Sequence, residues 1–270
     1  MVKVVRVLVL PLAVLLGLWT SPMADAATSL PGSMAAVGDS ITRAYDVCCW
    51  YGDHAGDSWS TGGTSNNGVS SHYERLLARH PAIAGHEYND AVSGAKASDL
   101  SSQVSAAVSQ KARYVTILIG ANDLCTSSVD TMTSTSAFTD QVTSALSVLH
   151  QGLPRSQIFI ASIPNVYQLW SVLKGNYLAQ FVWSTANICQ SMLASSNTDT
   201  DRQQVVEREL AFNEILAQAC AQYAQCRWDG NAVYNYQFSP SQVSTLDFFH
   251  PSLSGQAALA DITWAASWWR

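Results

Sequence analysis

The sequence predicts an α/β fold in which a parallel β-sheet is covered by helices on both faces. Short apolar segments with the length of buried strands alternate with longer segments whose apolar residues recur at helical spacing. The clearest strand is residues 114–119, which are rich in β-branched side chains. We find no internal repeat, low-complexity tract or linker, and we therefore expect one domain over residues 27–270.

The first expected strand covers residues 34–37 and stops at Gly38. A helix is expected to begin around Ser40, because apolar residues then recur at helical spacing. This places Ser40 in the first turn of a helix at the carboxyl end of a strand, where open α/β sheets bind ligands and free N–H groups favour negative charge. The alternative is that the serine only caps the helix.

The remaining elements follow from the same patterns. Residues 47–68 are a long loop whose aromatic residues, Trp50, Tyr51 and Trp59, form a wall near Ser40 or pack the loop onto the core. Further along the chain we expect a helix at 70–79, a strand at 87–91, a helix around 100–108, the strand at 114–119, a helix at 134–151, a strand at 157–162, a mostly helical insertion at 165–199, a helix at 201–223, a short strand within 227–238, and a closing helix at 252–268 with Pro251 at its first position.

The N-terminus has the composition of a secretory signal peptide over residues 1–26. Lys3 and Arg6 precede an apolar run at residues 7–19, and Ala24-Asp25-Ala26 is typical of a cleavage site. The apolar run is too short for a comfortable transmembrane helix. We therefore expect a secreted, extracellular protein without a transmembrane segment after cleavage.

Charge argues against a nucleic-acid partner. Removing Lys3, Arg6 and Asp25 from 14 basic and 20 acidic residues leaves 12 and 19, a net charge near −7. No basic patch interleaved with aromatic residues occurs, so nucleic acid is not an expected partner. We expect a monomer, although the sequence does not determine the oligomeric state.

Six cysteines in an exported chain suggest up to three disulfides. Cys220 and Cys226 are close enough for a local loop, and Cys125 could pair with Cys189. This would leave Cys48 and Cys49 as a vicinal disulfide or as free thiols, and spacing alone does not decide the pairing. No cysteine has the spacing of zinc ligands. Gly52-Asp53-His54 with Asp57 could suggest a metal site, but we expect these to be exposed polar residues of the loop, and we therefore expect no metal site.

Polar residues follow three of the expected strands: Ser40, Gly94 and Asn122. The carboxyl ends of parallel strands lie along one edge of a sheet, so we expect these residues to converge. Near the C-terminus, Asp247 and His250 are three residues apart and can share one turn. Together these residues supply a nucleophile, a base and an orienting carboxylate.

In such an arrangement Ser40 Oγ would attack an ester carbonyl, His250 would take the proton, and Asp247 would hold the imidazole. The oxyanion would be bound by the N–H of Ser40, the N–H of Gly94 and the side-chain amide of Asn122. Gly94 suits this role because no Cβ would block a close approach. Each residue also has an ordinary structural role, so the prediction depends on their occurring together.

Gly-Asp-Ser at 38–40, the glycine after the second strand, Gly-x-Asn-Asp at 120–123 and Asp-x-x-His-Pro at 247–251 resemble the SGNH hydrolases, also called the GDSL lipase/esterase family. The four letters map onto Ser40, Gly94, Asn122 and His250. The resemblance implies a flavodoxin-like three-layer α/β/α sandwich, no cofactor, and ester hydrolysis through an acyl-enzyme. Asp123 belongs to the same motif, and we expect it to hold the strand-end turn.

The segment Ser-Trp-Ser-Thr-Gly-Gly at 58–63 looks like the secreted bacterial lipase and phospholipase B-like branch of the family, which implies a lipid acyl ester as the substrate. Tryptophan-rich loops at 50–59 and 165–183 fit an apolar acyl pocket, or they fill the core. Two alternatives stay open. One is a short-chain or carbohydrate (acetyl) esterase, and the other is a catalytically dead binding protein, which would lack one of the site residues.

Overall fold

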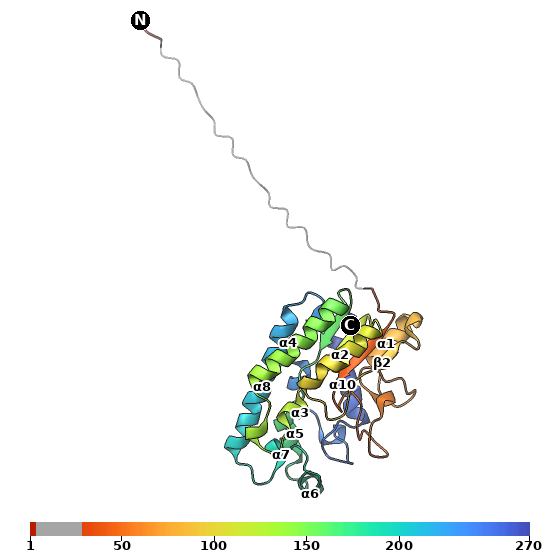
Figure 1. Cartoon of the computed structure of the whole chain (residues 1–270), viewed down its shortest axis with the longest axis vertical. Coiled ribbons are helices and arrows are strands. Elements are labelled where there is room, and N and C mark those ends of the chain that lie inside the picture. Colours follow the sequence, from red (N-terminus) through yellow and green to blue (C-terminus); the bar gives the residue numbers. More distant parts are fainter. Residues whose placement is uncertain (4–28) are drawn as a thin grey trace.

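The protein has a five-stranded parallel sheet with the strand order β2-β1-β3-β4-β5, which is the flavodoxin-like order. The computed structural model describes residues 1–3 and 29–270 (Figure 1), so the predicted signal peptide lies almost entirely outside the described residues. Helices flank the sheet, which confirms the predicted α/β class. Within the described part of the chain, no helix is both long and apolar enough to cross a membrane.

The strands are β1 (Met34–Gly38), β2 (Glu87–Asn89), β3 (Tyr114–Leu118), β4 (Gln157–Ile160) and β5 (Cys226–Trp228). The α-helices are α1 (His72–Arg79), α2 (Leu100–Ser109), α3 (Ala121–Leu124), α4 (Thr135–Gly152), α5 (Val166–Leu173), α6 (Tyr177–Thr185), α7 (Gln190–Leu193), α8 (Asp199–Ala221), α9 (Ala232–Asn235) and α10 (Leu253–Ala266). All the predicted strands are confirmed, as are the predicted helices from residue 70 onward, with ends shifted by a few residues.

The helix expected after the first strand is wrong. Residues 40–46 form turns instead, and Ala44 and Asp46 adopt positive φ angles of 50° and 53°. The Asp46 carboxylate accepts a hydrogen bond from the N–H of Gly52 at 2.6 Å, which turns the chain into the long loop. A helix cannot continue through two left-handed residues, so the apolar spacing in this segment reflects burial rather than helicity.

The expected position of Pro251 at the start of the last helix is also wrong. The helix begins at Leu253, and the hydroxyl of Ser252 caps it by accepting from the N–H of Gly255 at 3.3 Å. Pro251 lies before the helix and forms an isolated antiparallel bridge with Val243. Ser252 is the N-cap because its hydroxyl can accept from a free N–H of the first turn, whereas the side chain of proline has no acceptor.

One face of the sheet packs against α1 and α10 around a buried histidine. His72 Nδ1 lies 2.8 Å from the hydroxyl of Tyr114, and Nε2 lies 2.8 Å from the hydroxyl of Thr263. Thr263 already donates to the carbonyl of Leu259, so it accepts from Nε2–H, and the imidazole is neutral with Nδ1 as the acceptor. Burial lowers the pKa of His72 from 6.5 to about 3.

Helices α2, α4 and α8 pack side by side as a second layer. Phe138 of α4 stacks on Phe212 of α8 with ring centroids 3.9 Å apart, and both rings are fully buried. Aromatic side chains of this size contribute much of the apolar area that a core removes from water. This packing holds together the helices that follow β2, β3 and β4.

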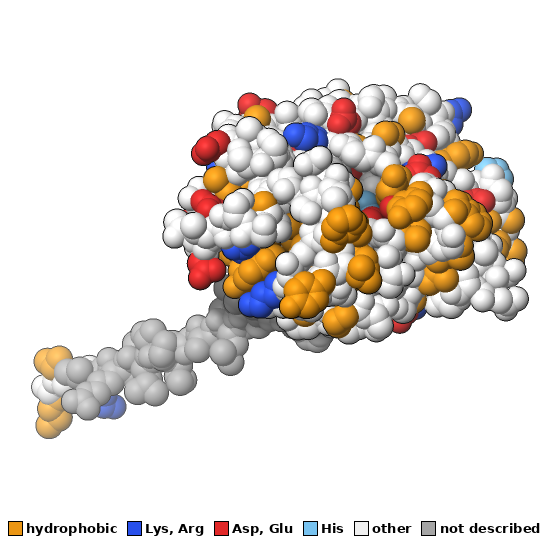
Figure 2. Space-filling view, turned by 90° about the horizontal axis from the view of Figure 1, so that it is seen from below, with side chains coloured by type: hydrophobic (Ala, Val, Ile, Leu, Met, Phe, Trp, Pro, Cys, Tyr) orange, Lys and Arg blue, Asp and Glu red, His pale blue; other side chains and the backbone are white. Residues whose placement is uncertain are grey.

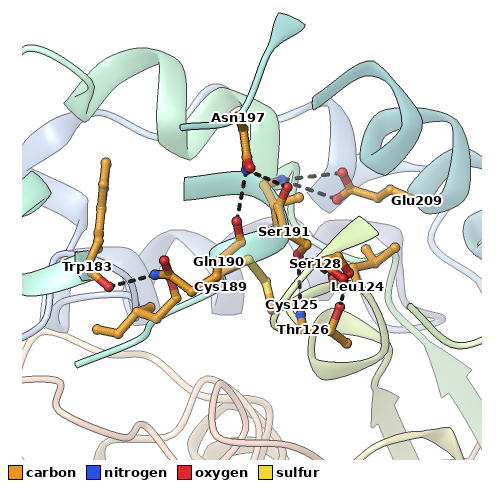
Figure 3. Close-up of a disulfide and its surroundings, with 12 residues drawn as sticks. Leu124, Cys125, Thr126, Ser128, Trp183, Cys189, Gln190, Ser191, Asn197 and Glu209 are labelled. Atoms are coloured by element: carbon orange, nitrogen blue, oxygen red, sulfur yellow. Dashed lines mark hydrogen bonds between the residues drawn. A yellow bond between two sulfur atoms is a disulfide. The ribbon is translucent and has the colours of Figure 1, made fainter. Parts of the chain in front are cut away.

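Two of the predicted disulfides are present, Cys125–Cys189 and Cys220–Cys226, and Cys48 and Cys49 are free thiols. Figure 3 shows how the first disulfide joins the chain after α3 to the start of α7. Ser191 strengthens this junction, because its hydroxyl donates to the carbonyl of Leu124 at 2.6 Å. The helical insertion is therefore fastened directly beside the carboxyl end of β3.

The buried His72 makes the stability of the fold sensitive to acid. The unfolded chain binds a proton at this residue near pH 6.5, whereas the folded chain resists it down to about pH 3. Full stability is therefore present above pH 6.5 and is lost as the pH falls, by about 1.4 kcal/mol per pH unit. We expect the stability difference between the wild type and His72→Gln to shrink by this slope from pH 6 to pH 4 in urea unfolding. A difference that stays constant over this range would contradict the assignment.

Candidate active site

The structure brings the five predicted site residues to one cavity. Strands β2, β1 and β3 are neighbours, so Gly94, Ser40 and Asn122 lie at the same edge of the sheet. Asp247 and His250 reach the same edge from the loop before α10. All five line a cavity of about 780 Å³. The convergence expected from the strand ends is therefore observed.

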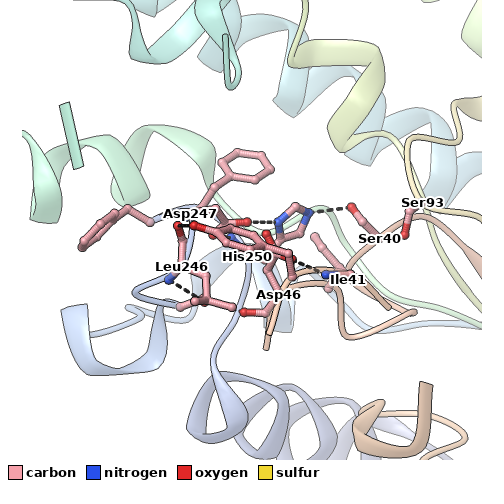
Figure 4. Close-up of polar contacts among 12 residues, drawn as sticks. Ser40, Ile41, Asp46, Ser93, Leu246, Asp247 and His250 are labelled. Carbon is pink, nitrogen blue, oxygen red and sulfur yellow. Dashed lines mark hydrogen bonds and ion pairs between the residues drawn. The ribbon is translucent and has the colours of Figure 1, made fainter. Parts of the chain in front are cut away.

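A continuous chain of hydrogen bonds joins Asp247, His250 and Ser40 (Figure 4). His250 Nε2 lies 2.7 Å from Ser40 Oγ, and His250 Nδ1 lies 2.5 Å from Asp247 Oδ2. The other carboxylate oxygen of Asp247 accepts from the N–H of Phe249 at 2.8 Å and from the N–H of His250 at 3.0 Å. Because an ionised carboxylate only accepts, Nδ1 carries the proton and Nε2 is free to accept the serine proton.

Two further contacts position His250, one against its ring and one in the loop that carries it. The ring of Tyr45 packs against it with centroids 5.1 Å apart. Behind the loop, the indole N–H of Trp183 donates to the carbonyl of Phe248 at 2.9 Å, where Phe248 adopts a positive φ of 56°. These contacts restrict the histidine to the orientation that faces Ser40.

The conformation of Gly38 determines where the Ser40 backbone lies. Gly38 has a φ of 147°, and a Cβ at this position would lie 2.2 Å from the carbonyl oxygen of Leu118 on β3. The side-chain amide of Gln103 on α2 accepts from the N–H of Gly38 at 2.7 Å and donates to its carbonyl at 2.9 Å. The end of β1 is therefore clamped from both sides.

Two buried glutamines that position the serine turn were missed by sequence reasoning. Gln103 is the first, and Gln256 on α10 is the second: it accepts from the N–H of Trp59 at 2.9 Å and donates to the carbonyl of Ile41 at 2.9 Å. Both side chains are buried. One feature of the sequence could have indicated the buried role of Gln103. It falls three residues after Leu100, on the apolar face of an expected helix, where a polar side chain needs a hydrogen-bond partner.

Asp39, which precedes the serine, is completely buried. One carboxylate oxygen accepts from the N–H of Ile41 at 2.9 Å, and the other has no protein partner. Burial raises the pKa of Asp39 to about 7, against the opposing effects of this hydrogen bond and of His250. The side chain therefore ties the serine turn together and carries only part of a negative charge near neutral pH.

Asn122 and Asp123 tie the Gly94 loop to the start of α3. The Asn122 amide donates to the carbonyl of Ala95 at 3.0 Å, which leaves its second hydrogen for the cavity. Asp123 accepts from the N–H of Ala97 at 2.9 Å. Asp123 therefore holds the neighbouring loop, and burial raises the pKa of its carboxyl.

The structure gives a second reason for a glycine at position 94, apart from the approach of the oxyanion. A Cβ on Gly94 would meet no protein atom within 4 Å, so space within the protein does not require glycine. Its φ of 85° does, because side chains other than glycine rarely adopt this left-handed region. The backbone conformation, which directs the N–H, therefore favours glycine at this position.

The expected aromatic pocket is only partly correct. Trp59 and Trp183 are buried in the core and do not line the cavity. The aromatic residues that line it are Tyr45, Tyr51, Phe181 and Phe249. The tryptophans therefore support the site from behind, and smaller aromatic side chains form its wall.

Two groups of side chains within the described residues bring three possible metal-ligating atoms within 4.8 Å of one another. One contains Asp46, Asp247 and His250. His250 already bonds to both Asp247 and Ser40, and the Asp46 carboxylate accepts from the N–H of Gly52. The other is Cys48, His54 and Asp57. The sequence placed His54 and Asp57 together as exposed residues, whereas the structure buries His54 and adds Cys48 to the group. Burial raises the pKa of Cys48 to about 11, so its thiol is protonated at neutral pH. Neither group supplies the four ligands of a structural zinc site.

The contrast between two glycines can be tested. Gly38→Ala places a Cβ against a backbone carbonyl, and we expect it to lower the free energy of unfolding by at least about 4 kcal/mol or to prevent folding. Gly94→Ala meets open space and carries only the strain of its positive φ, about 1–2 kcal/mol. Urea unfolding of the two variants measures the difference, and equal losses would contradict this account.

Comparisons with known proteins agree with the fold. The GDSL-like lipase/acylhydrolase family matches residues 34–263. Membrane-associated phospholipase B1 of Rattus norvegicus is 24% identical over 242 residues, which cover 73% of this chain but only 16% of that protein. Two solved structures share the fold, each at 16% sequence identity. The match to TesA has a TM-score of 0.52 and covers 87% of this chain and 97% of the TesA chain. The match to a carbohydrate esterase family 2 enzyme from Corynascus thermopiles (Myceliophthora fergusii) has a TM-score of 0.53 and covers 90% of this chain and 66% of that chain. Because the match extends over most of the sequence, from β1 into α10, the chain belongs to the GDSL-like lipase/acylhydrolase family.

Proposed function

We propose that this protein hydrolyses carboxylic esters of lipids with Ser40 as the nucleophile, His250 as the base and Asp247 as its orienting carboxylate. The observation that carries the proposal is the unbroken chain of hydrogen bonds from Asp247 to Ser40, which opens into a cavity of about 780 Å³. A serine hydroxyl is a weak nucleophile until a base removes its proton in the transition state. Here the base is already in contact with that hydroxyl.

The reaction would pass through an acyl-enzyme. Ser40 Oγ attacks the ester carbonyl carbon while its proton moves to His250 Nε2, and the carbonyl oxygen becomes an oxyanion. The N–H groups of Ser40 and Gly94 and the free amide hydrogen of Asn122 stabilise that charge, and one such donor typically contributes about 3 kcal/mol. His250 then protonates the leaving alcohol, and water hydrolyses the acyl-serine by the same steps. No cofactor enters this scheme.

The walls of the cavity support a lipid ester as the substrate. Apolar side chains line much of it: Tyr51, Phe181, Val182, Ile188, Leu246 and Phe249. Such a lining favours an acyl chain, because removing it from water releases free energy in proportion to the apolar area buried. The name of the rat relative, a membrane-associated phospholipase B1, points to the same substrate class.

A second candidate is a short-chain or carbohydrate (acetyl) ester. A mainly apolar pocket of about 50 Å³ lies next to the site, and Ile41, Ala121 and Phe249, which are chain neighbours of Ser40, Asn122 and His250, help to line it. This volume holds only a few atoms. Polar residues on the cavity wall, such as Ser93 and Asn187, could then bind the hydroxyl groups of a sugar.

We also propose that the protein is exported. The predicted signal peptide and the two disulfides support this location, since disulfides persist mainly in oxidising compartments. Export would place the enzyme where extracellular lipid or polysaccharide esters occur.

The triad assignment predicts that its members act as a unit. We expect Ser40→Ala and His250→Ala each to lower kcat by at least about 10³-fold, and the double variant to be no slower than either single variant. Urea unfolding should show intact folding, and Ser102→Ala, on the exposed side of α2, should retain full activity. Substantial turnover by Ser40→Ala would remove this residue as the nucleophile.

A hydrolysis panel distinguishes the two substrate classes. It contains p-nitrophenyl esters from acetate to palmitate, phosphatidylcholine, lysophosphatidylcholine and acetylated xylan, with Ser40→Ala as the blank. We expect serine-dependent release of long-chain fatty acids, because the apolar cavity wall can bind the chain. Activity confined to acetate, butyrate or xylan would contradict the lipid proposal and favour the smaller pocket as the acyl site.

A further inference from the structure

Large apolar side chains are exposed around the mouth of the catalytic cavity. They come from the loop after β1 and from α6, and each exposes between 64% and 86% of its surface: Trp50, Tyr51, Tyr177, Leu178 and Phe181. We call these five residues the rim. Figure 2 shows hydrophobic side chains gathered on this side of the molecule around a depression in which a histidine is visible.

The rim is continuous with the catalytic cavity. Tyr51 and Phe181 are exposed at the surface and also line the cavity that contains Ser40 and His250. Trp50 adjoins Tyr51 in the chain, and Tyr177 and Leu178 occupy the turn of α6 that precedes Phe181. A molecule that lies against the rim is therefore in contact with the entrance to the active site.

The charge around α6 differs from that of the rest of the protein. The chain carries 20 acidic residues, yet no aspartate or glutamate occurs from residue 141 to residue 198. Lys174 is the only lysine or arginine between residues 156 and 198, and its ammonium lies 4.5 Å above the ring of Trp170. Residues 141–198 therefore add no carboxylate that lipid phosphates would repel. Beside Tyr51 in the other part of the rim, the exposed Asp53 is paired with Arg43 at 2.9 Å.

From these features we infer that the rim docks on the surface of a phospholipid bilayer, so that α6 lies in the headgroup region and lipid esters enter the cavity directly. Tyrosine and tryptophan suit this position, because the ring is buried among acyl chains while the hydroxyl or N–H stays with the headgroups. Leucine and phenylalanine add apolar area. The inference rests on the proposed lipid-ester function for its substrate and adds the surface by which that substrate is reached.

Binding to vesicles tests the rim without using catalysis. The measurement is co-sedimentation with phosphatidylcholine vesicles, on a Ser40→Ala background that leaves the lipid intact. The test variant is Tyr177→Ser with Leu178→Ser, because neither residue lines the catalytic cavity and serine is well tolerated in the first turn of a helix. The matched control is Leu210→Ser on α8, another exposed leucine, which also does not line the cavity.

We expect the double variant to lower vesicle partitioning by about tenfold or more, since it removes two large apolar side chains from the contact. With Ser40 restored, hydrolysis of vesicle phospholipid should fall in parallel, while kcat/KM for water-soluble p-nitrophenyl acetate stays unchanged. Leu210→Ser should behave as the wild type. Binding should also persist in 1 M salt, because apolar contact rather than charge drives it.

Equal vesicle binding by the double variant and the wild type, or no binding by the wild type, would overturn the inference. So would a dimer in size-exclusion chromatography that the double variant dissociates in the absence of vesicle binding, because the rim would then be a contact between two copies of the chain. Vesicle binding that depends on the rim, without ester hydrolysis by the unsubstituted protein, would support the surface and overturn the proposed function.

Discussion

The site depends on the conformation of the chain where β1 ends. Gly38 turns at a φ that only glycine tolerates well, against the backbone of β3, and Gln103 binds both of its polar backbone groups. These contacts determine the direction in which the next two residues leave the sheet. Asp39 then turns inward and Ser40 turns toward the cavity, so a change at the strand end would displace the serine even with every site residue present.

The base and its carboxylate, His250 and Asp247, depend on one contact between near neighbours in the chain and one between distant residues. Asp247 and His250 bond within one short turn, and the backbone N–H groups of that turn fix the carboxylate. The contact between His250 and Ser40 spans most of the chain, and the packing of α10 makes it possible. Gln256 connects the two ends of this distant contact, because it belongs to α10 and bonds to the carbonyl of Ile41 beside the serine.

The environment of the serine carries a cost in stability. Asp39 and Asp123 are buried beside the site, each with a carboxylate oxygen that has no protein partner, and burial raises the pKa of both. Burying such groups is unfavourable unless hydrogen bonds compensate, and here backbone N–H groups compensate only in part. In return, Asp39 holds the turn that contains the serine, and Asp123 holds the loop after Gly94. Disulfide Cys125–Cys189 adds to these restraints by fastening the helical insertion next to Asn122.

The strands and most helices could be predicted from the sequence, because burial of one face or of a whole strand leaves apolar residues at a characteristic spacing. The positions of Ser40, Gly94 and Asn122 after three strands also sufficed to predict a common edge, since parallel strands place their carboxyl ends together. The spacing of Asp247 and His250 predicted only that these two residues share one turn. The pairing Cys220–Cys226 was accessible for a similar reason, as the two residues are close in the chain.

Other features were decided by tertiary contacts between residues far apart in sequence. The apolar spacing after Ser40 predicted a helix, but the turn to Gly52 ends it, and the spacing alone contains no sign of that contact. The sequence allowed Trp59 either to line a pocket or to fill the core, and the structure buries it completely in the core. The roles of Gln103 and Gln256 depend on partners 65 and 215 residues away. The sequence by itself determined which chemical groups were present and at which strand ends, and only the tertiary structure decided their orientation, because orientation comes from side chains that distant segments bury against them.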